Sequence, residues 1–301
     1  ESGIAAPYTY TGGSYPGTAG DCAGTLAGGG TTCTIEVQYS PSTIATHNDT
    51  ISFAYNDGVA VQNSTRDVTG VGVAPATITI TEADPYDYGT VAVGATSNHV
   101  FTLTNTGTFT ASAIAEIGLA APFAFSGGSF PGTSGTCAVT LAGGASCDIE
   151  IAYSPVATGA LADTISIQYN NGASVVTSDR DVQGTGAAPA TITITETDPY
   201  DFGNVTQGSS ANHIFTLNNT GAVAATAVGG SGLAAPYTFT GGSFPGTAGT
   251  CAATINAGAN CDIDVTFAPT SAVVSNDTID INFNDGACLL YTSPSPRDGL
   301  L

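Results

Sequence analysis

Acidic side chains recur in two groups that could provide oxygen ligands for a metal ion. The groups are Glu82, Asp84 and Asp87, and, further along the chain, Glu196, Asp198 and Asp201. Carboxylate oxygens are the ligands that Ca²⁺ prefers, and an ion bound near a domain junction would stiffen a chain of domains. The spacing is not that of an EF-hand loop, and Asp-Pro is also a common opening for a turn. We keep calcium binding as a hypothesis beside the simpler interpretation, a solvated turn with a local Arg–Asp pair.

Six cysteines form three pairs that are close in sequence. The pairs are Cys22 and Cys33, Cys137 and Cys147, and Cys251 and Cys261. None has the Cys-x-x-Cys spacing of a zinc ribbon or a redox site. An Ala-Gly-Gly sequence inside the second pair can turn and place the two cysteines opposite each other on paired strands. We therefore expect three hairpin disulfides, each worth about 2–3 kcal/mol, and an oxidising compartment: extracellular, cell-surface or periplasmic. Buried free thiols are the alternative.

The three histidines do not form a catalytic pattern. His99 and His213 occupy equivalent places in two repeats, whereas His47 lies elsewhere in its own repeat. A hydrolase triad needs a nucleophile beside the histidine, and the sequence contains no Gly-x-Ser-x-Gly. A zinc site needs several converging ligands. We expect these histidines to face solvent or to lie at strand ends, and we predict no catalytic residues and no cofactor.

Arg66 and Arg180 both stand in the sequence Arg-Asp-Val, and Arg297 is the third and last basic residue apart from histidine. A guanidinium group can bind an anionic ligand. We favour an ion pair within the domain, or a charge that protects an edge strand from further pairing.

Several aromatic residues could provide a surface on which a sugar stacks. They are Tyr86, Tyr88, Phe123, Phe125 and Phe130. These residues alternate with small ones, a pattern that suits packing in a core and under a loop better than display at the surface. Core packing is therefore our expectation.

Overall charge excludes two classes of partner. The chain has 24 acidic residues, three arginines and no lysine, which gives a formal charge of −21. Nucleic acids and anionic lipids both require a basic surface, so we expect neither as a partner. The sequence has no apolar run of the ~18 residues that would cross a membrane as a helix.

The chain repeats itself. Ala-Ala-Pro followed by an aromatic residue stands at 5–8, 120–123 and 234–237, at a spacing typical of a small domain. Within the repeats, apolar residues alternate with polar ones, as in Ile149-x-Ile151-x-Tyr153 and Ile165-x-Ile167-x-Tyr169. Alternation of this kind indicates strands with one buried face, so we predict an all-β fold.

The second repeat is the one for which we predict a complete domain. Its expected strands are 76–82, 99–104, 111–118, 148–153, 163–169 and 174–183, with a turn over 84–89 and further short strands beside the cysteines. Asn171-Gly172 is a strong signal for a two-residue hairpin turn. Seven or eight short strands with regular turns indicate an immunoglobulin-like β-sandwich.

We predict four segments along the chain. They are an immunoglobulin-like domain truncated at its N-terminus (1–74), a complete domain (75–188), a domain that lacks its last strand (189–287), and a foreign tail (288–301). The tail looks like the translation of a sequencing-library adapter; a natural anchor with a reactive thiol at Cys288 is the alternative. Because the linkers at Ala74-Pro75 and Ala188-Pro189 are short, we expect tandem domains arranged as a semi-rigid rod.

Several motifs together resemble the choice-of-anchor D repeat of bacterial surface proteins. They are Tyr88-Gly89, Val93-Gly94, Phe101-Thr-Leu-Thr-Asn-Thr-Gly107, the paired cysteines, Ser154-Pro155 and Gly184-Thr-Gly186. That repeat is similar to the immunoglobulin-like domains of Hydin and abnormal-spindle proteins and to the PapD-like sandwich. The resemblance implies tandem extracellular repeats on large secreted or surface-attached bacterial proteins, and it implies no catalytic residues.

These observations lead to one expected function and two alternatives. We expect a non-enzymatic structural or adhesive module that spaces, presents or contacts other domains of the same long chain, with surface glycans or proteins as further partners. The first alternative is an accessory, carbohydrate-contacting array attached to a secreted hydrolase. A periplasmic chaperone of the PapD kind is less favoured, because such chaperones are not long tandem arrays.

Overall fold

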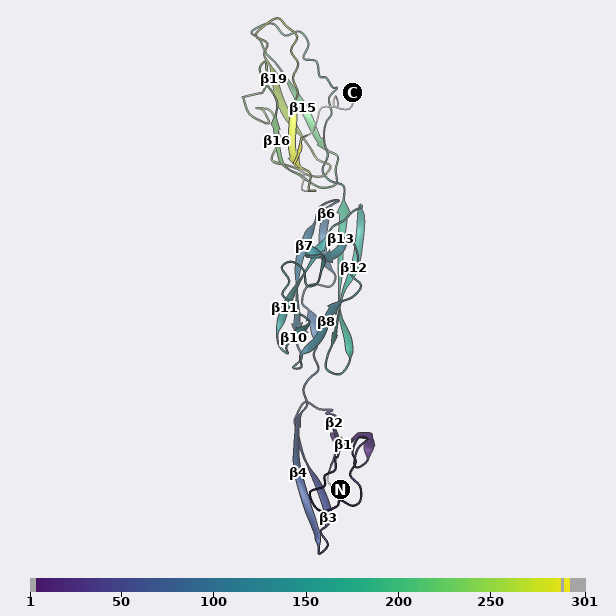
Figure 1. The fold of residues 1–301 in the computed structure, drawn as a ribbon. Helices are drawn as coiled ribbons and strands as arrows, with labels where there is room; N and C mark the ends of the chain where they lie inside the picture. Colours follow the sequence, from purple (N-terminus) through teal and green to yellow (C-terminus); the bar gives the residue numbers. More distant parts are fainter. Residues whose placement is uncertain (1–3, 288–289, 293–301) are drawn as a thin grey trace.

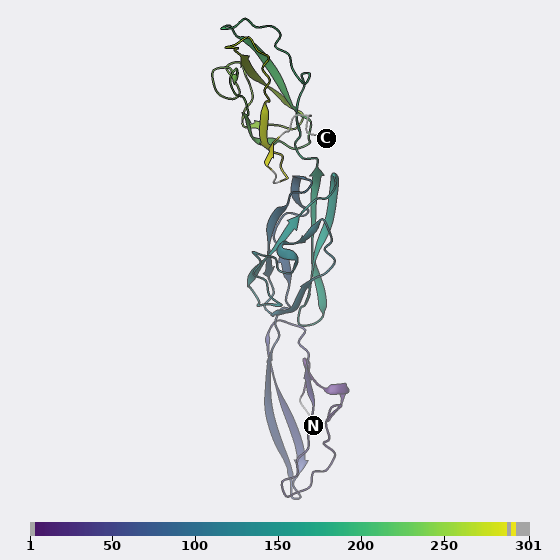
Figure 2. The same ribbon diagram turned by 45° about the horizontal axis from the view of Figure 1, so that its top comes forward.

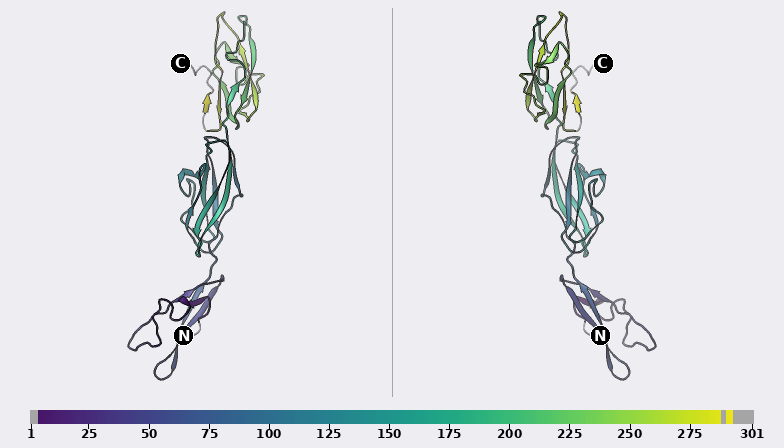
Figure 3. Two further views of the ribbon diagram at one scale, coloured as in Figure 1. Left: turned by 90° about the vertical axis from the view of Figure 1, so that its right-hand side faces the viewer. Right: turned by 90° about the vertical axis from the view of Figure 1, so that its left-hand side faces the viewer.

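The computed structural model describes residues 4–287 and 290–292 of the chain. Three units follow one another in a row, each built almost entirely of strands (Figure 1). The same succession is seen after the turn in Figure 2 and from both sides in Figure 3. The all-β fold class and the tandem sandwich architecture are therefore confirmed. We refer to the units as the first, second and third repeats.

The second repeat is a sandwich of two sheets. One sheet has the order β5-β7-β11-β9, with β5 Ile78–Ile80, β7 Ser97–Asn105, β11 Ser146–Tyr153 and β9 Phe123–Phe125. The other has the order β10-β8-β12-β13-β6, with β10 Thr140–Leu141, β8 Ala111–Glu116, β12 Gly159–Asn170, β13 Val175–Ala187 and β6 Tyr86–Ala92. A short 3₁₀ turn, η2 Ser126–Gly128, follows β9. All pairs are antiparallel except β13 with β6, which is parallel.

The core lies between these two sheets. Its largest fully enclosed side chains include Phe101, Leu103, Ile149, Ile151, Tyr153, Ile165, Ile167 and Val182. Ile149 lies opposite Phe101 in the β11–β7 ladder, and Ile151 lies opposite His99. Because side chains of a strand alternate between faces, the period-two residues of β11 and β12 enter the same core. Burial of this apolar surface is what holds the sheets together.

The first repeat contains two separate two-stranded sheets. They pair β1 Tyr8–Tyr10 with β2 Val37–Tyr39, and β3 Thr46–Asn56 with β4 Val61–Val71; η1 Thr11–Gly13 follows β1. The β3–β4 hairpin corresponds to β12–β13 of the second repeat. Its strands are mostly exposed, because the described part of this repeat has no counterparts of β5, β6 and β7 to cover them.

The third repeat has the same two layers in a reduced form. One sheet has the order β14-β15-β19-β17, with β14 Ile192–Ile194, β15 Ala211–Asn219, β19 Asn260–Phe267 and β17 Tyr237–Phe239. The other has the order β18-β16-β20-β21, with β18 Thr254–Ile255, β16 Ala225–Ser231, β20 Asp280–Asn284 and β21 Leu290–Thr292. The boundaries of the repeats at 74/75 and 188/189 stay predictions.

Two local expectations differ from the structure. The turn expected over 84–89 becomes strand from Tyr86 onward, because β6 pairs with β13, a partner far away in sequence. The hairpin at Asn171-Gly172 has a four-residue loop, since Asn170 lies opposite Val175. At the edge of the third repeat, β21 pairs with β20 over three residues, and the expectation that this domain lacks its last strand stays a prediction. The rest of the predicted foreign tail lies outside the described residues.

The disulfides join the pairs that the spacing predicts, but not across a hairpin. Cys147 lies in β11, whereas β10, which lies between the two cysteines in sequence, pairs with β8 in the opposite sheet. The Cys137 N–H donates to Asp148 O at 3.1 Å. The Cys137–Cys147 disulfide therefore joins β11 to the beginning of the segment that crosses from this sheet to the other. The glycine-rich segment between the cysteines is compatible with a hairpin within one sheet and with a crossing to the other sheet, so the sequence could not distinguish the two. The other two disulfides are Cys22–Cys33 and Cys251–Cys261.

Candidate functional site: the repeat junctions and the last-strand groove

The junction between the first and second repeats is short and hydrogen-bonded on both sides. Gly72 N–H donates to Ala45 O at 2.8 Å inside the first repeat, and Phe109 N–H of the second repeat donates to Ala74 O at 3.0 Å. Val73 is therefore the only residue between Gly72, whose backbone bonds to the first repeat, and Ala74, whose backbone bonds to the second.

At the junction between the second and third repeats, the residue whose backbone bonds to the second repeat is followed directly by one whose backbone bonds to the third. Val93 N–H donates to Ala187 O at 2.8 Å, and Ala222 N–H of the third repeat donates to the next carbonyl, Ala188 O, at 3.0 Å. The repeats also touch beside this link, since a side-chain carbon placed on Gly286 would lie 3.4 Å from Ala92 Cβ. Backbone that is bonded on both sides restricts the angle between neighbouring domains.

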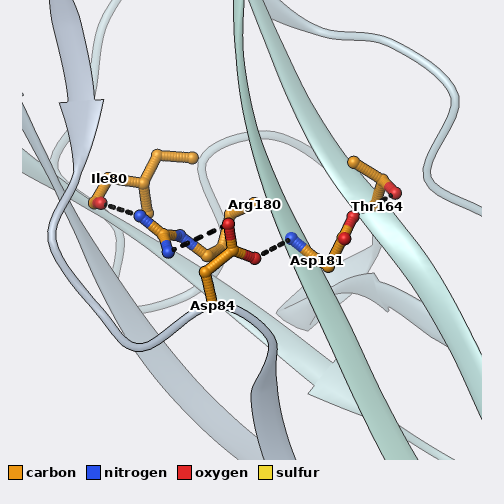
Figure 4. Close-up of polar contacts among 5 residues, drawn as sticks. All are labelled: Ile80, Asp84, Thr164, Arg180 and Asp181. Carbon is orange, nitrogen blue, oxygen red and sulfur yellow. Dashed lines mark hydrogen bonds and ion pairs between the residues drawn. The ribbon is translucent and has the colours of Figure 1, made fainter.

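The Arg180 side chain connects β13, the last strand of the second repeat, to two segments near the beginning of the same repeat (Figure 4). Its guanidinium donates to Ile80 O and pairs with Asp84, with 3.5 Å between Nη1 and Oδ2. Asp181 N–H donates to the other oxygen of Asp84 at 3.2 Å, and Thr164 Oγ1 donates to Asp181 Oδ1 at 2.7 Å. The Arg180 side chain is only 15% exposed, whereas Asp84 is 55% exposed. This is the ion pair within a domain that the sequence favoured over a ligand-binding role.

The junction acids do not converge on one point. Glu82 Oε1 accepts from Thr102 N–H at 2.9 Å, while Asp87 Oδ1 accepts from Gly89 N–H at 2.7 Å and Asp84 faces Arg180. Glu196 and Asp201 make the equivalent backbone contacts in the third repeat. Over 4–287 and 290–292, His, Cys, Asp and Glu side chains form no group of three that could hold a metal ion. The calcium hypothesis therefore gains no support from the geometry.

The equivalent histidines are stacked on tyrosine rings rather than facing solvent. His99 lies on Tyr86 with 3.9 Å between ring centroids and 19° between planes, and His213 lies on Tyr200 in the same way at 3.8 Å. Burial lowers the pKa of His99, and the nearby Glu82 charge partly offsets that effect. We expected these histidines to face solvent or to lie at strand ends. Both lie near the start of their strands, β7 and β15, but they are half-buried because a tyrosine ring of the segment after Asp-Pro covers them.

The aromatic residues proposed as a sugar-stacking surface belong mainly to the core and its edge. Phe123 is buried and stacks on Tyr153 at 4.8 Å, and the Tyr88 hydroxyl donates to Ile151 O at 2.9 Å. Burial raises the pKa of Tyr88 far above its usual range. Phe125 and Phe130 pack edge to face, partly buried against the same core. Core packing, the favoured interpretation, describes these residues correctly.

A buried asparagine that the sequence indicated only as part of a turn joins four segments. Asn105 has no exposed surface; its Oδ1 accepts from Thr77 and Gly107 N–H, and its Nδ2 donates to Phe109 O and Leu141 O. Asn219 makes the equivalent contacts in the third repeat. Its recurrence in Asn-Thr-Gly was the available signal, but that motif is equally typical of an exposed turn.

A groove of about 360 Å³ opens into the third repeat. Both apolar and polar side chains line it. Its lining includes Ile192, Ile194, Tyr200, Phe202, Phe215, Leu233, Val265 and Ile279, with Glu196, Asp198, Asp277 and Thr278. Among the corresponding residues of the second repeat, Asp163 and Tyr86 lie opposite Val182 of β13, and Ile80 O and Asp84 contact Arg180.

The sequence matches the family model described as "HYDIN/CFA65/VesB-like, Ig-like domain" over residues 79–184 and again over 192–291. These two matches cover more than half of the chain. The chain therefore belongs to the HYDIN/CFA65/VesB-like family of immunoglobulin-like domains, and the predicted similarity to Hydin-type domains is confirmed. Comparison with curated proteins finds no match.

Solved structures with a similar arrangement of strands are distant. The VesB protease of Vibrio cholerae is 17% identical with a TM-score of 0.30, and the match covers 37% of this chain and 32% of VesB. PapD-like domain 7 of human CEP192 is 16% identical with a TM-score of 0.26, over 38% of this chain and 87% of that one. The class 5 fimbriae chaperone CfaA is 11% identical with a TM-score of 0.25, over 73% and 100%. Such low TM-scores carry no argument about function, and the chain spans about a third of VesB.

Proposed function

We propose that this chain is a non-enzymatic spacer and scaffold module, whose repeats hold other domains of a longer protein at a set distance. The observation that carries the proposal is the bonding at the junctions. Ala187 and Ala188 are adjacent residues, yet their carbonyls accept from different repeats, Val93 N–H and Ala222 N–H. A linker without free residues transmits orientation from one repeat to the next, as a spacer requires.

The proposed setting is outside the cell or at its surface, in a bacterial protein of the choice-of-anchor D type. Three disulfides support an oxidising compartment. The charge of −21 supports a soluble, self-repelling surface on long arrays. No helix among residues 4–287 and 290–292 has the length and apolar character needed to cross a membrane. Adhesion to surface glycans or proteins would be a secondary role of such a rod.

A second candidate is an accessory array on a secreted hydrolase. The observation in its favour is the family description, which includes VesB. The carbohydrate contacts of this candidate would need aromatic residues other than Phe123 and Tyr88, which the core occupies. Both candidates share the spacer role and differ in what the spacer carries.

Small-angle scattering of the whole chain tests the spacer proposal. We expect one narrow distribution of end-to-end distances that is unchanged by salt. Insertion of six Gly-Ser residues between Ala187 and Ala188 separates the two bonded carbonyls and should broaden that distribution. The matched control places the same insertion after Gly58, in an exposed hairpin loop of the first repeat, where no change is expected. A wild-type distribution as broad as that of the junction variant would contradict the proposal.

A further inference from the structure

The second repeat is joined to its neighbours at opposite ends of β13. Where the repeat begins, Ala76 N–H donates to Asn171 O, in the loop immediately before β13. Where the repeat ends, Val93 N–H donates to Ala187 O, at the last residue of β13. The two links therefore lie about 40 Å apart, the length of this extended strand. Figure 1 shows them leaving from the two ends of the repeat.

A pull along the row of repeats would therefore act along the strands of the second repeat. From the first repeat the pull reaches β5, the turn at Asp84 and then β6; from the third repeat it reaches β13. The strands β6 and β13 are parallel neighbours, with Val182 opposite Tyr86 and Ala187 opposite Ala92. Because they would be pulled from opposite ends, these two strands can separate only by sliding past each other, and the bonds between them are loaded together.

Side chains add to the contact between these strands. Arg180 of β13 donates to Ile80 O and pairs with Asp84, with 3.5 Å between Nη1 and Oδ2. Further along β13, Gln183 Nε2 donates to Asp87 Oδ2 of β6 at 3.3 Å. The Arg180 side chain is only 15% exposed, so its bonds are largely shielded from water, which strengthens them.

We refer to residues 80–92 and 180–187 together as the terminal contact, because the first and last segments of the repeat meet there. Val182, which lies opposite residues of both β12 and β6, is fully enclosed. By comparison, β5 pairs with β7 over three residues only, so that pairing adds little resistance to a pull from the first repeat.

The rest of the repeat lies between the two halves of the terminal contact in sequence. This intervening chain includes Asn105 with its buried hydrogen bonds, and the Cys137–Cys147 disulfide. It can be stretched only after the terminal contact has opened. The contact should therefore decide how strongly the repeat resists a pull, whereas the disulfide contributes to its stability in the absence of force.

We propose that the second repeat bears tension along the chain, and that the terminal contact carries the load. A chain that keeps other domains at a distance is pulled whenever its two ends are attached to different bodies. A direct contact between the first and last segments keeps the intervening chain folded under such a pull. This inference concerns the resistance of one repeat to unfolding, and it does not depend on a fixed angle between repeats.

Optical tweezers with a handle at each end of the whole chain test the proposal. At constant force the second repeat should unfold in one step of about 35 nm, since about 100 residues are released at ~3.5 Å each. Arg180→Met should raise the rate of that step by about five- to thirtyfold, because forced unfolding follows the height of the unfolding barrier. Arg66→Met, in the first repeat, is the matched control and should leave this step unchanged.

The disulfide separates the terminal contact from overall stability. The double variant Cys137→Ser, Cys147→Ser should lower stability mainly through the unfolded chain, so the rate at constant force should change by less than about twofold. The same variant identifies the step, which should lengthen by about 3 nm because the residues inside the disulfide loop are also released. A rate increase as large as that of Arg180→Met would show that general stability, and not the terminal contact, sets the resistance.

The direction of the pull gives a second test on the same bonds. Thr96→Lys introduces the only lysine of the chain, and a handle on it pulls at the end of β6 that is next to the third repeat. With the other handle at the C-terminus, the strands are peeled apart from the Val93–Ala187 end. Each bond then bears the load alone, so unfolding should be at least about tenfold faster at the same force. Equal rates for the two directions, or an unchanged rate for Arg180→Met, would overturn the proposal.

Discussion

The Arg180 guanidinium and the Asp84 carboxylate lie 3.5 Å apart, and this pair connects the last strand of the second repeat to the turn that precedes β6. The same guanidinium reaches Ile80 O, so one side chain contacts two segments from the beginning of the domain. β13 is the strand on which both β12 and β6 pair. Stability of the second repeat should therefore depend on how β13 is held.

Replacement of Arg180 by methionine should lower the free energy of unfolding of the second repeat by about 1–2 kcal/mol. The aliphatic part would still pack, but Ile80 O and Asp84 would lose their charged donor. Hydrogen exchange of peptides from β12 and β13 measures this change in the whole chain. Arg66→Met is the matched control, because Arg66 is exposed on β4 and has no ion-pair partner in the described residues. Equal losses for both variants would show that the contact does not matter.

Replacement of Asn105 by alanine should be more damaging, with a loss of about 3 kcal/mol or more. Four backbone groups, two in buried and two in partly buried hydrogen bonds, would lose their partners at once, and each unsatisfied buried group costs ~1–3 kcal/mol. The second repeat should lose exchange protection while the third keeps it, and Asn219→Ala should show the reverse. Asn98→Ala, at an exposed strand position, serves as the control. An effect of Asn105→Ala as small as that of the control would contradict the assigned role.

Loss of the Cys137–Cys147 disulfide should destabilise the second repeat by about 2–3 kcal/mol, because a loop of this size then regains its freedom in the unfolded chain. The double variant Cys137→Ser, Cys147→Ser, followed by urea unfolding, measures the loss. Non-reducing peptide mapping of the wild type should recover three local cross-links and no free thiol among the six cysteines. Free thiols at those positions would reject the pairing.

Acidification should weaken the second repeat through His99. Its pKa in the folded protein is lowered by burial, so below about pH 6.5 the unfolded chain binds a proton that the folded chain resists. Stability is therefore complete above that pH and falls as the pH decreases, by at most ~1.4 kcal/mol per pH unit for one group. His99→Phe keeps the stacking on Tyr86 and should flatten the dependence between pH 5 and 6.5. Urea unfolding at several pH values provides the measurement, and an unchanged slope would exclude His99 as the cause.

Removal of divalent cations should leave the chain unchanged. Glu82 and Asp87 accept hydrogen bonds from backbone N–H groups, and Asp84 forms an ion pair with Arg180. No bound cation is therefore needed to stabilise these three carboxylates. We expect EDTA to alter neither the melting temperature nor the scattering profile. A clear loss of stiffness or a lower melting temperature with EDTA, reversed by added Ca²⁺, would instead make these carboxylates ligands.

Local patterns predicted most of the strands, because alternation needs no knowledge of neighbours. Ile149 and Ile151, or Ile165 and Ile167, indicate which side of a strand is buried wherever that strand is placed. Predictions went wrong where a segment depends on a distant partner. The segment over 84–89 reads as a turn from its Asp-Pro and glycine, and it is strand from Tyr86 only because β13 lies beside it.

The sequence by itself determined the repeats, the all-β class, the local cysteine pairs and the acidic surface, since each depends on residue type and short spacing. The tertiary structure alone decided that Arg180 pairs with Asp84 and that Asn105 joins four segments. Those contacts join residues far apart in the chain, and which strands become neighbours is settled by the packing of the whole domain rather than by any stretch of it.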